Sequence, residues 1–164
     1  MGLVRSARPF ALAAAVLLLG AIGAEAQRPR RERMRNEDGR REVAAAVARD
    51  LSSYRARVRA PNGQEIDLTP VLRRVAEGRS LRDAGFPPHD GDGSVFLNLT
   101  DRDAGRRPLP DKPRGYYFEF VVPPNDRARW PGPQRLIMGR GGEAYYSPDH
   151  YDPRTIVALH RSNR

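Results

Sequence analysis

The hydrophobic positions of residues 42–59 follow a helical spacing. Five apolar residues recur at intervals of four, four, three and four residues: Val43, Val47, Leu51, Tyr54 and Val58. This spacing places them along one stripe of an amphipathic helix, and the turn-forming run Ala60-Pro61-Asn62-Gly63 ends the pattern. The sequence therefore predicts a helix over residues 42–59.

A second, shorter helical pattern begins at Thr69. Pro70 stands at the first helical position, where a missing N–H is tolerated and the fixed φ suits a helix start. The apolar residues that follow share one face, and Gly78 stops the pattern. We expect this helix to place its apolar face on the core.

Beyond residue 93 the pattern changes from helical to alternating. Five short runs read as strands: 94–99, 116–122, 134–138, 144–146 and 155–160. The segment 139–142 between two of them reads as a hairpin turn, because it lacks the Lys and the strand-to-helix context of a phosphate-binding loop. Helices followed by short strands predict an α+β fold, with N-terminal helices packed on one face of a small antiparallel β-sheet and the other face open to solvent or ligand.

The N-terminus has the pattern of a secretory signal peptide. Two arginines precede an apolar run over residues 10–22, and Ala24-Glu25-Ala26 provides small residues for cleavage. We expect residues 1–26 to be removed, leaving no membrane segment. Residues 27–41 are rich in Arg and nearly free of apolar residues, which predicts a disordered arm, and residues 42–164 are expected to form a single domain.

Composition narrows the chemistry. The chain of 164 residues has a formal net charge of +9 and no cysteine, which excludes disulfides, thiol nucleophiles and thiolate metal sites. Lys112 is the only lysine among 29 basic residues, so nearly all cationic contacts would be planar guanidinium groups suited to phosphate. An anionic partner is the natural expectation.

A carboxylate, a guanidinium and an imidazole stand in three successive segments. Glu119 is the one ionisable residue within the strand 116–122, and Arg135 lies in the next strand, where alternation allows both to share one sheet face. His150 follows in a polar turn beside Tyr151. These are the groups needed for metal-free RNA cleavage, in which a base activates the ribose 2′-hydroxyl, an acid protonates the leaving 5′-oxygen and arginine stabilises the developing charge.

Three ordered blocks make the sequence resemble the microbial guanyl-preferring ribonucleases, the family that includes barnase. The blocks are Tyr116-Tyr117-Phe118-Glu119-Phe120-Val121-Val122-Pro123, Arg135-Leu136-Ile137-Met138-Gly139 and Tyr145-Tyr146-Ser147-Pro148-Asp149-His150-Tyr151. Upstream, residues 85–98 and Leu109-Pro110 fit the same pattern, so that the resemblance covers roughly residues 66–160. It implies the microbial ribonuclease fold and an endoribonuclease that forms a 2′,3′-cyclic phosphate and then hydrolyses it.

The resemblance also implies a role for each site residue. Glu119 would be the general base, His150 the general acid and Arg135 the phosphate ligand. Tyr151 would contact the base or position the histidine. Arg129 or Arg127 would supply a second phosphate-binding arginine, although the insertion of Trp130-Pro131-Gly132-Pro133 alters the spacing.

Base recognition departs from the family pattern. The family's loop reads Phe-x-Asn-Arg-Glu, and its Glu bonds the guanine edge; here Phe96-Leu97-Asn98 leads into Leu99-Thr100-Asp101-Arg102-Asp103. Phe96 and Asn98 are the implied substrate-binding residues that match. Asp103, or in its place Asp101, would accept from the guanine with a shorter side chain on a longer loop. We therefore expect guanine preference to be retained in weakened form.

The expected partner is single-stranded RNA, with no cofactor and no metal. The resemblance adds a proteinaceous inhibitor inside the producing cell, and the protein itself is expected to be a secreted monomer, periplasmic or extracellular. A different class of function fits the same charge: a non-catalytic, secreted basic module of this fold that binds RNA or another polyanion. Salt-sensitive binding that survives loss of Glu119 and His150 would distinguish the binding module.

Overall fold

The computed structural model describes residues 32–60, 62–123 and 132–159. The chain divides into two compact units, residues 1–35 and 36–164, and the second holds every strand. Residues 32–50 are helical. The elements that follow are η1 (Leu51–Ser53), β1 (Arg57–Arg59), β2 (Glu65–Asp67), α2 (Thr69–Ala76), η2 (Arg82–Ala84), β3 (Ser94–Phe96), β4 (Tyr117–Val121), β5 (Arg135–Gly139), β6 (Ala144–Ser147) and β7 (Val157–Ala158). Among these described residues, no helix has the length and apolar character needed to cross a membrane.

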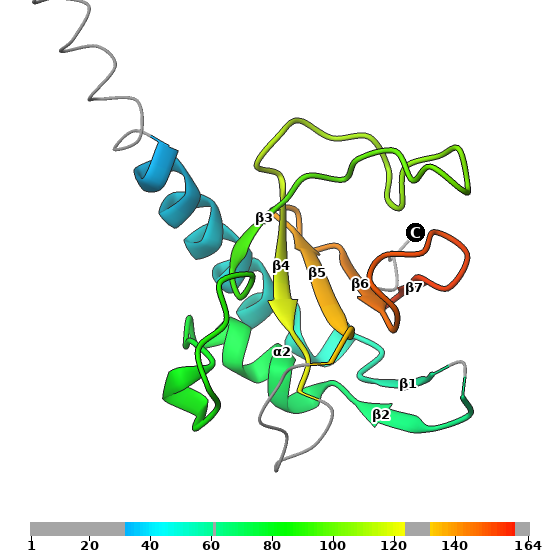
Figure 1. Cartoon of the computed structure of the whole chain (residues 1–164). Helices are drawn as coiled ribbons and strands as arrows, with labels where there is room; N and C mark the ends of the chain where they lie inside the picture. Colours follow the sequence, from blue (N-terminus) through cyan, green and yellow to red (C-terminus); the bar gives the residue numbers. More distant parts are fainter. Residues whose placement is uncertain (1–31, 61, 124–131, 160–164) are drawn as a thin grey trace, which may run out of the picture. The chain divides into compact units, whose positions relative to one another are not determined.

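The second unit contains two antiparallel sheets besides its helices. The larger has five strands in the order β3-β4-β5-β6-β7, and β1 pairs with β2 in a separate hairpin (Figure 1). Each strand of the larger sheet pairs with the next in sequence, and each of these pairings is antiparallel. The predicted α+β class and the five predicted strands are confirmed, with boundaries shifted by a few residues. The predicted hairpin turn also joins β5 to β6, closed by the Gly139 N–H donating to the Glu143 carbonyl over 2.7 Å.

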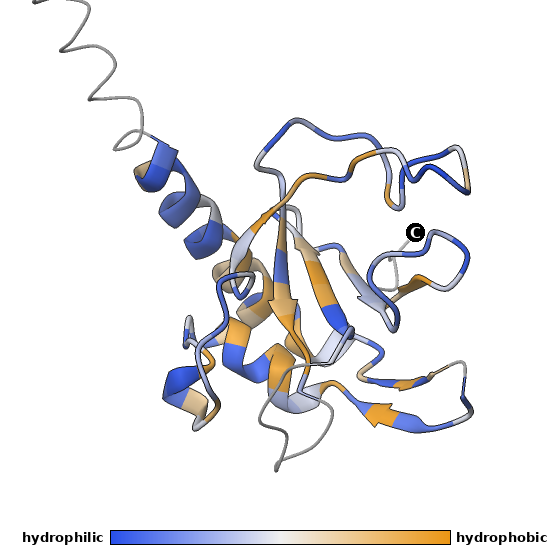
Figure 2. Ribbon diagram, viewed as in Figure 1, coloured by the Kyte–Doolittle hydropathy of each residue, from blue (hydrophilic) through white to orange (hydrophobic). Residues whose placement is uncertain are grey.

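The core lies between the helices and one face of the larger sheet. Alternation along β4 sends Phe118 and Phe120 to this face, where they meet Val43 and Val47 of the first helix and Leu72 of α2. Figure 2 shows the matching hydrophobic colouring along β4 and β5. The predicted packing of the helices on one sheet face is therefore confirmed.

The other sheet face has its own smaller apolar cluster rather than being fully open. Tyr117, Ile137 and Leu109 are buried there, and partly buried aromatic residues, Tyr151 among them, pack against them. The polar side chains of β4 and β5 on this face project beside the cluster.

The expectation of a disordered arm is wrong for residues 32–41, which are helical. Arg, Glu and Met are good helix formers, and extending an existing helix is easier than nucleating one. Gly39 is buried against the sheet: a Cβ at this position would lie 2.4 Å from Cζ of Phe118. Arg140 also pairs with Glu42 across 3.6 Å. The predicted signal peptide and residues 27–31 lie outside the described residues.

The helix predicted over 42–59 ends earlier, at residue 50. Val58 continues the helical spacing but belongs to β1, where it is buried opposite Ile66. Its neighbours Arg57 and Arg59 stand opposite Asp67 and Glu65, and such opposite-charge pairs favour a hairpin. A strand of three residues with one buried position cannot be distinguished from a helix by periodicity.

A buried ion pair fastens the loop before β3 to the rest of the unit. The Arg74 guanidinium donates to both carboxylate oxygens of Asp92, over 2.7 and 2.9 Å, and to the Val121 carbonyl over 3.1 Å. The two side chains are only 6% and 8% exposed. Asp92 also accepts from the Val121 N–H over 3.0 Å. This pair joins α2, the loop and β4, and it fixes where β3 begins.

Candidate functional site

A cleft of about 580 Å³ opens beside β3, on the sheet face opposite the helices. Its lining comes from three places: residues 95–103 with Pro108, Glu119 in the middle of β4, and His150 with Tyr151 in the loop after β6. Three segments distant in sequence therefore meet around one carboxylate.

The Glu119 carboxylate has a donor on each oxygen. The Ser94 hydroxyl donates to Oε1 over 2.8 Å, and the Tyr151 hydroxyl donates to Oε2. Ser94 lies directly opposite Glu119 in the β3–β4 pairing, so the register of the sheet sets this contact. Glu119 is half-buried, which leaves the carboxylate accessible from the cleft.

Arg135 shares the sheet face of Glu119, an arrangement that alternation allowed. It pairs with Val121, two residues beyond Glu119, and side chains two apart in a strand point to the same side. Arg135 is only 4% exposed, and its Nη1 donates to the carbonyls of Gly132 and Gln134 over 2.6 and 2.8 Å. The guanidinium is thus fixed at the start of β5 by its own local backbone.

Tyr151 lies between these two charged groups. Burial and the hydrogen bond to Glu119 raise the pKa of the Tyr151 hydroxyl, while the nearby Arg135 guanidinium lowers it by less. The hydroxyl is consequently protonated at neutral pH and remains a donor. The sequence offered two roles for Tyr151, contacting the base or positioning the histidine; the structure shows a third contact, with Glu119.

His150 occupies the rim of the cleft in a constrained loop. His150 and Tyr151 both have positive φ, 62° and 77°, a conformation that non-glycine residues rarely adopt. The Ser147 hydroxyl accepts from the Tyr151 N–H over 2.7 Å and so helps to hold the turn. The His150 side chain is exposed, and its ring centroid is 5.8 Å from that of Tyr151. Strain of this kind concentrates at functional loops.

The loop expected to recognise the base lines the other wall of the cleft. The Phe96 ring packs against Tyr151 with centroids 4.8 Å apart. Asn98 is buried, and its side-chain amide donates to the Leu109 and Pro110 carbonyls and accepts from the Leu109 N–H. The Asn98 side chain therefore holds the loop and leaves its main chain beside the cleft.

Two acidic residues of this loop differ in their freedom to bind a ligand. Asp101 Oδ1 accepts from the N–H groups of Asp103 and Ala104, over 3.0 and 2.7 Å, and so stabilises a turn. Asp103 is exposed and lines the cleft. Of the two candidates for binding guanine, Asp103 therefore has the carboxylate that is less occupied by hydrogen bonds within the loop.

Some predicted residues cannot be placed, and one residue at the cleft was missed. Arg129 and Arg127 lie outside the described residues. Ser94 was not identified from the sequence, although the alternation of 94–99 and 116–122 contains the signal once the register is known. In the described part of the chain, no three His, Asp or Glu residues gather as metal ligands.

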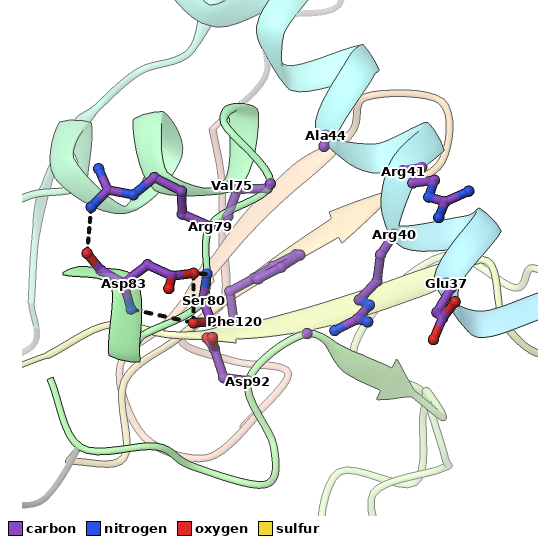
Figure 3. A pocket seen from close by; sticks show the side chains of 12 residues that line it. Glu37, Arg40, Arg41, Ala44, Val75, Arg79, Ser80, Asp83, Asp92 and Phe120 are labelled. Atoms are coloured by element: carbon purple, nitrogen blue, oxygen red, sulfur yellow. Dashed lines mark hydrogen bonds between the residues drawn. The ribbon is translucent and has the colours of Figure 1, made fainter. Parts of the chain in front are cut away.

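A second hollow, of about 390 Å³, lies on the helix side of the sheet (Figure 3). Several of its polar groups are already engaged by neighbouring residues. Arg79 pairs with Glu77 over 3.3 Å and donates to the Asp83 carbonyl, and the Ser80 hydroxyl donates to the Asp83 carboxylate over 2.8 Å. We take the cleft at Glu119 as the functional site, because there a carboxylate, an imidazole and a phenol meet around open space.

The chain is similar to proteins of known activity, although no protein-family model matches it. Guanyl-specific ribonuclease St of Saccharopolyspora erythraea is 33% identical over 91 residues, which cover 54% of this chain and 82% of that relative. A crystal structure of ribonuclease Sa2 with guanosine-2′-cyclophosphate is 35% identical, covers 54% of this chain and 79% of its own, and has a TM-score of 0.39. Another, with 3′-GMP obtained by ligand diffusion, is 35% identical, with coverages of 55% and 80% and a TM-score of 0.38.

Proposed function

Since this chain belongs to the microbial guanyl-specific ribonuclease family, it is an endoribonuclease, and we propose that it cleaves single-stranded RNA without a metal ion, after guanosine. The reaction would form a 2′,3′-cyclic phosphate by attack of the ribose 2′-oxygen and then hydrolyse it. The observation that carries this proposal is the Glu119 carboxylate, held by two hydroxyl donors in a cleft that His150 borders.

Each step of cleavage has a group of this chain to perform it. Glu119 removes the proton of the 2′-hydroxyl, and the resulting oxygen forms a bond to the adjacent phosphorus. As the bond from phosphorus to the 5′-oxygen breaks, protonated His150 donates a proton to that oxygen. Arg135, close to the Tyr151 hydroxyl, stabilises the negative charge that develops on the phosphoryl oxygens.

Hydrolysis of the cyclic phosphate reverses these roles. His150, now neutral, activates a water molecule that attacks phosphorus, and Glu119 returns its proton to the 2′-oxygen as that bond breaks. The exposed rim position of His150 suits both steps, because the leaving nucleotide and the incoming water must each reach it from solvent.

The proposed preference for guanosine is supported by the similarity to a guanyl-specific ribonuclease and by the loop beside the cleft. Asp103 would accept from the guanine edge, while Asn98 keeps the loop shaped by binding Leu109 and Pro110. Phe96 and Tyr151 would form the apolar side of the base site. Because Asp103 has a shorter side chain than the family's Glu, discrimination against adenine would be weaker.

We further propose export of the protein as a monomer, with cleavage after Ala26. The supporting observation is the charged, apolar and small-residue pattern of residues 1–26. N-terminal sequencing of material recovered outside the cytoplasm tests this. An intracellular protein inhibitor would follow from the hazard that such an activity presents to its producer.

The test is incubation of the purified protein with mixed-sequence RNA in EDTA, beside His150→Ala and Glu119→Gln. The unmutated protein should leave 2′,3′-cyclic phosphates, mostly on guanosine, and each variant should lose about 10²–10⁴-fold in rate. A substrate with a 2′-deoxyribose at the cleavage position should resist, since it lacks the nucleophile. Binding without cleavage by all three proteins would instead identify the polyanion-binding module.

A further inference from the structure

Ser94 holds one side of the Glu119 carboxylate. Its hydroxyl donates to Oε1, and the Tyr151 hydroxyl donates to Oε2 from the opposite wall of the cleft. A carboxylate bound at both oxygens by two separate elements cannot rotate without breaking a hydrogen bond. Each oxygen still keeps a lone pair for a proton. We propose that Ser94 is a positioning residue that orients Glu119 toward the 2′-hydroxyl, an inference that rests on the ribonuclease function proposed above.

The surrounding fold holds Ser94 in place without using its hydroxyl. The Gly93 N–H donates to the Glu119 carbonyl over 2.7 Å, and the Ser94 N–H donates to the Gly91 carbonyl over 3.2 Å. Asp92, two residues upstream, is bound to Arg74 and to the Val121 N–H. These contacts fix the backbone of residue 94 opposite Glu119 whatever its side chain is.

The side chain itself serves one contact. Among the described residues, the Ser94 hydroxyl has one hydrogen bond, to Glu119. Ser94 is half-buried on the edge strand β3, where valine or threonine would satisfy strand preference better than serine. The Ser94 hydroxyl contributes neither to the turn nor to the core, and among the described residues it hydrogen-bonds to the proposed general base, Glu119. Positioning that carboxylate explains why a hydroxyl stands at residue 94.

The groups around Glu119 determine what loss of this hydroxyl would do. From β5 comes Arg135, from the loop after β6 come Tyr151 and His150, and from the loop before β3 comes His89. A Cβ on Gly91 would lie 3.1 Å from the His89 ring and 3.4 Å from Glu119 Oε1, so the imidazole lies on the Ser94 side of the carboxylate. Among the described residues, the hydrogen bond to Oε1 comes from Ser94.

The experiment compares Ser94→Thr with Ser94→Val, which have nearly the same shape and differ by the hydroxyl, and adds Ser94→Ala. The substrate is guanylyl-(3′→5′)-uridine, and kcat and KM are measured between pH 4 and 9. We expect kcat to fall about tenfold in the Val and Ala variants and to be restored in the Thr variant, with KM unchanged.

The possible failures can be told apart. If the unmutated protein does not cleave the dinucleotide or RNA, the proposed function is wrong. If it cleaves and the Val and Ala variants match it in kcat, the positioning role is overturned. A Thr variant as slow as the Val variant also overturns it, since the hydroxyl would then not be the cause. Urea unfolding of each variant verifies that the fold is intact.

Discussion

The buried pair of Arg74 and Asp92 provides the sharpest test of how the fold is held together. Replacing Asp92 by Ala leaves the guanidinium without its two carboxylate contacts in a site where the Arg74 side chain is 6% exposed. It also removes the acceptor of the Val121 N–H. Breaking a buried pair by removing one partner typically destabilises by about 3–5 kcal/mol, and we expect Asp92→Ala to fall in that range.

A loss of about 3–5 kcal/mol would be a large share of the free energy of unfolding, because domains of this size are stable by about 5–15 kcal/mol. Urea unfolding followed by circular dichroism at pH 7 gives the free energy directly. A matched control is Glu77→Ala, which removes an exposed ion pair with Arg79 and should change the stability by less than about 1 kcal/mol.

A double-mutant cycle separates the pair from its surroundings. Arg74→Met combined with Asp92→Ala removes both charges, so the double variant should lose less stability than the sum of the two single variants. A loss below about 1 kcal/mol for Asp92→Ala, or strict additivity in the cycle, would refute the view that this pair fastens the β3 loop to α2 and β4.

Two further predictions concern alkaline stability and the base-binding loop. Burial raises the pKa of all six tyrosines, to about 12 for Tyr54 and Tyr146, so their stabilising effect is complete below pH 10 and is lost as the pH rises toward 12. Tyrosine ionisation measured at 295 nm should therefore coincide with the unfolding measured by circular dichroism; ionisation of several tyrosines near pH 10 in the folded protein would contradict this. Replacing Asn98 by Ala removes three hydrogen bonds, two of them buried, and should cost about 2 kcal/mol while raising KM for the dinucleotide; an unchanged KM would show that loop shape does not govern base binding.

Local patterns were sufficient to select most residues of the candidate site. Alternation allowed Glu119 and Arg135 to share one sheet face, and the pairing of Arg135 with Val121 shows that they do. His150 was identified from its position in a polar turn, where no packing requirement explains an imidazole, and Tyr151 is the residue that follows it. These residues could be found because each sits within a short segment whose own periodicity or composition marks it.

Contacts between segments distant in sequence could not be found in this way. The partner of Glu119 Oε1 is Ser94, and the partner of Arg74 is Asp92, 18 positions away. Residues 85–98 fitted the family pattern, but nothing in the sequence indicated a partner for Asp92. Pairing depends on strand register, and a shift of one residue would have directed Ser94 to the opposite face.

The sequence by itself determined the α+β class, the antiparallel strands and the identity of the acid, base and phosphate-binding candidates, because alternation and turn composition are properties of short segments. Only the tertiary structure decided that residues 32–41 are helical, that Val58 belongs to a hairpin, and that two hydroxyls hold Glu119. The physical reason is that burial against a distant partner stabilises these features, and no local pattern specifies which partner will be there.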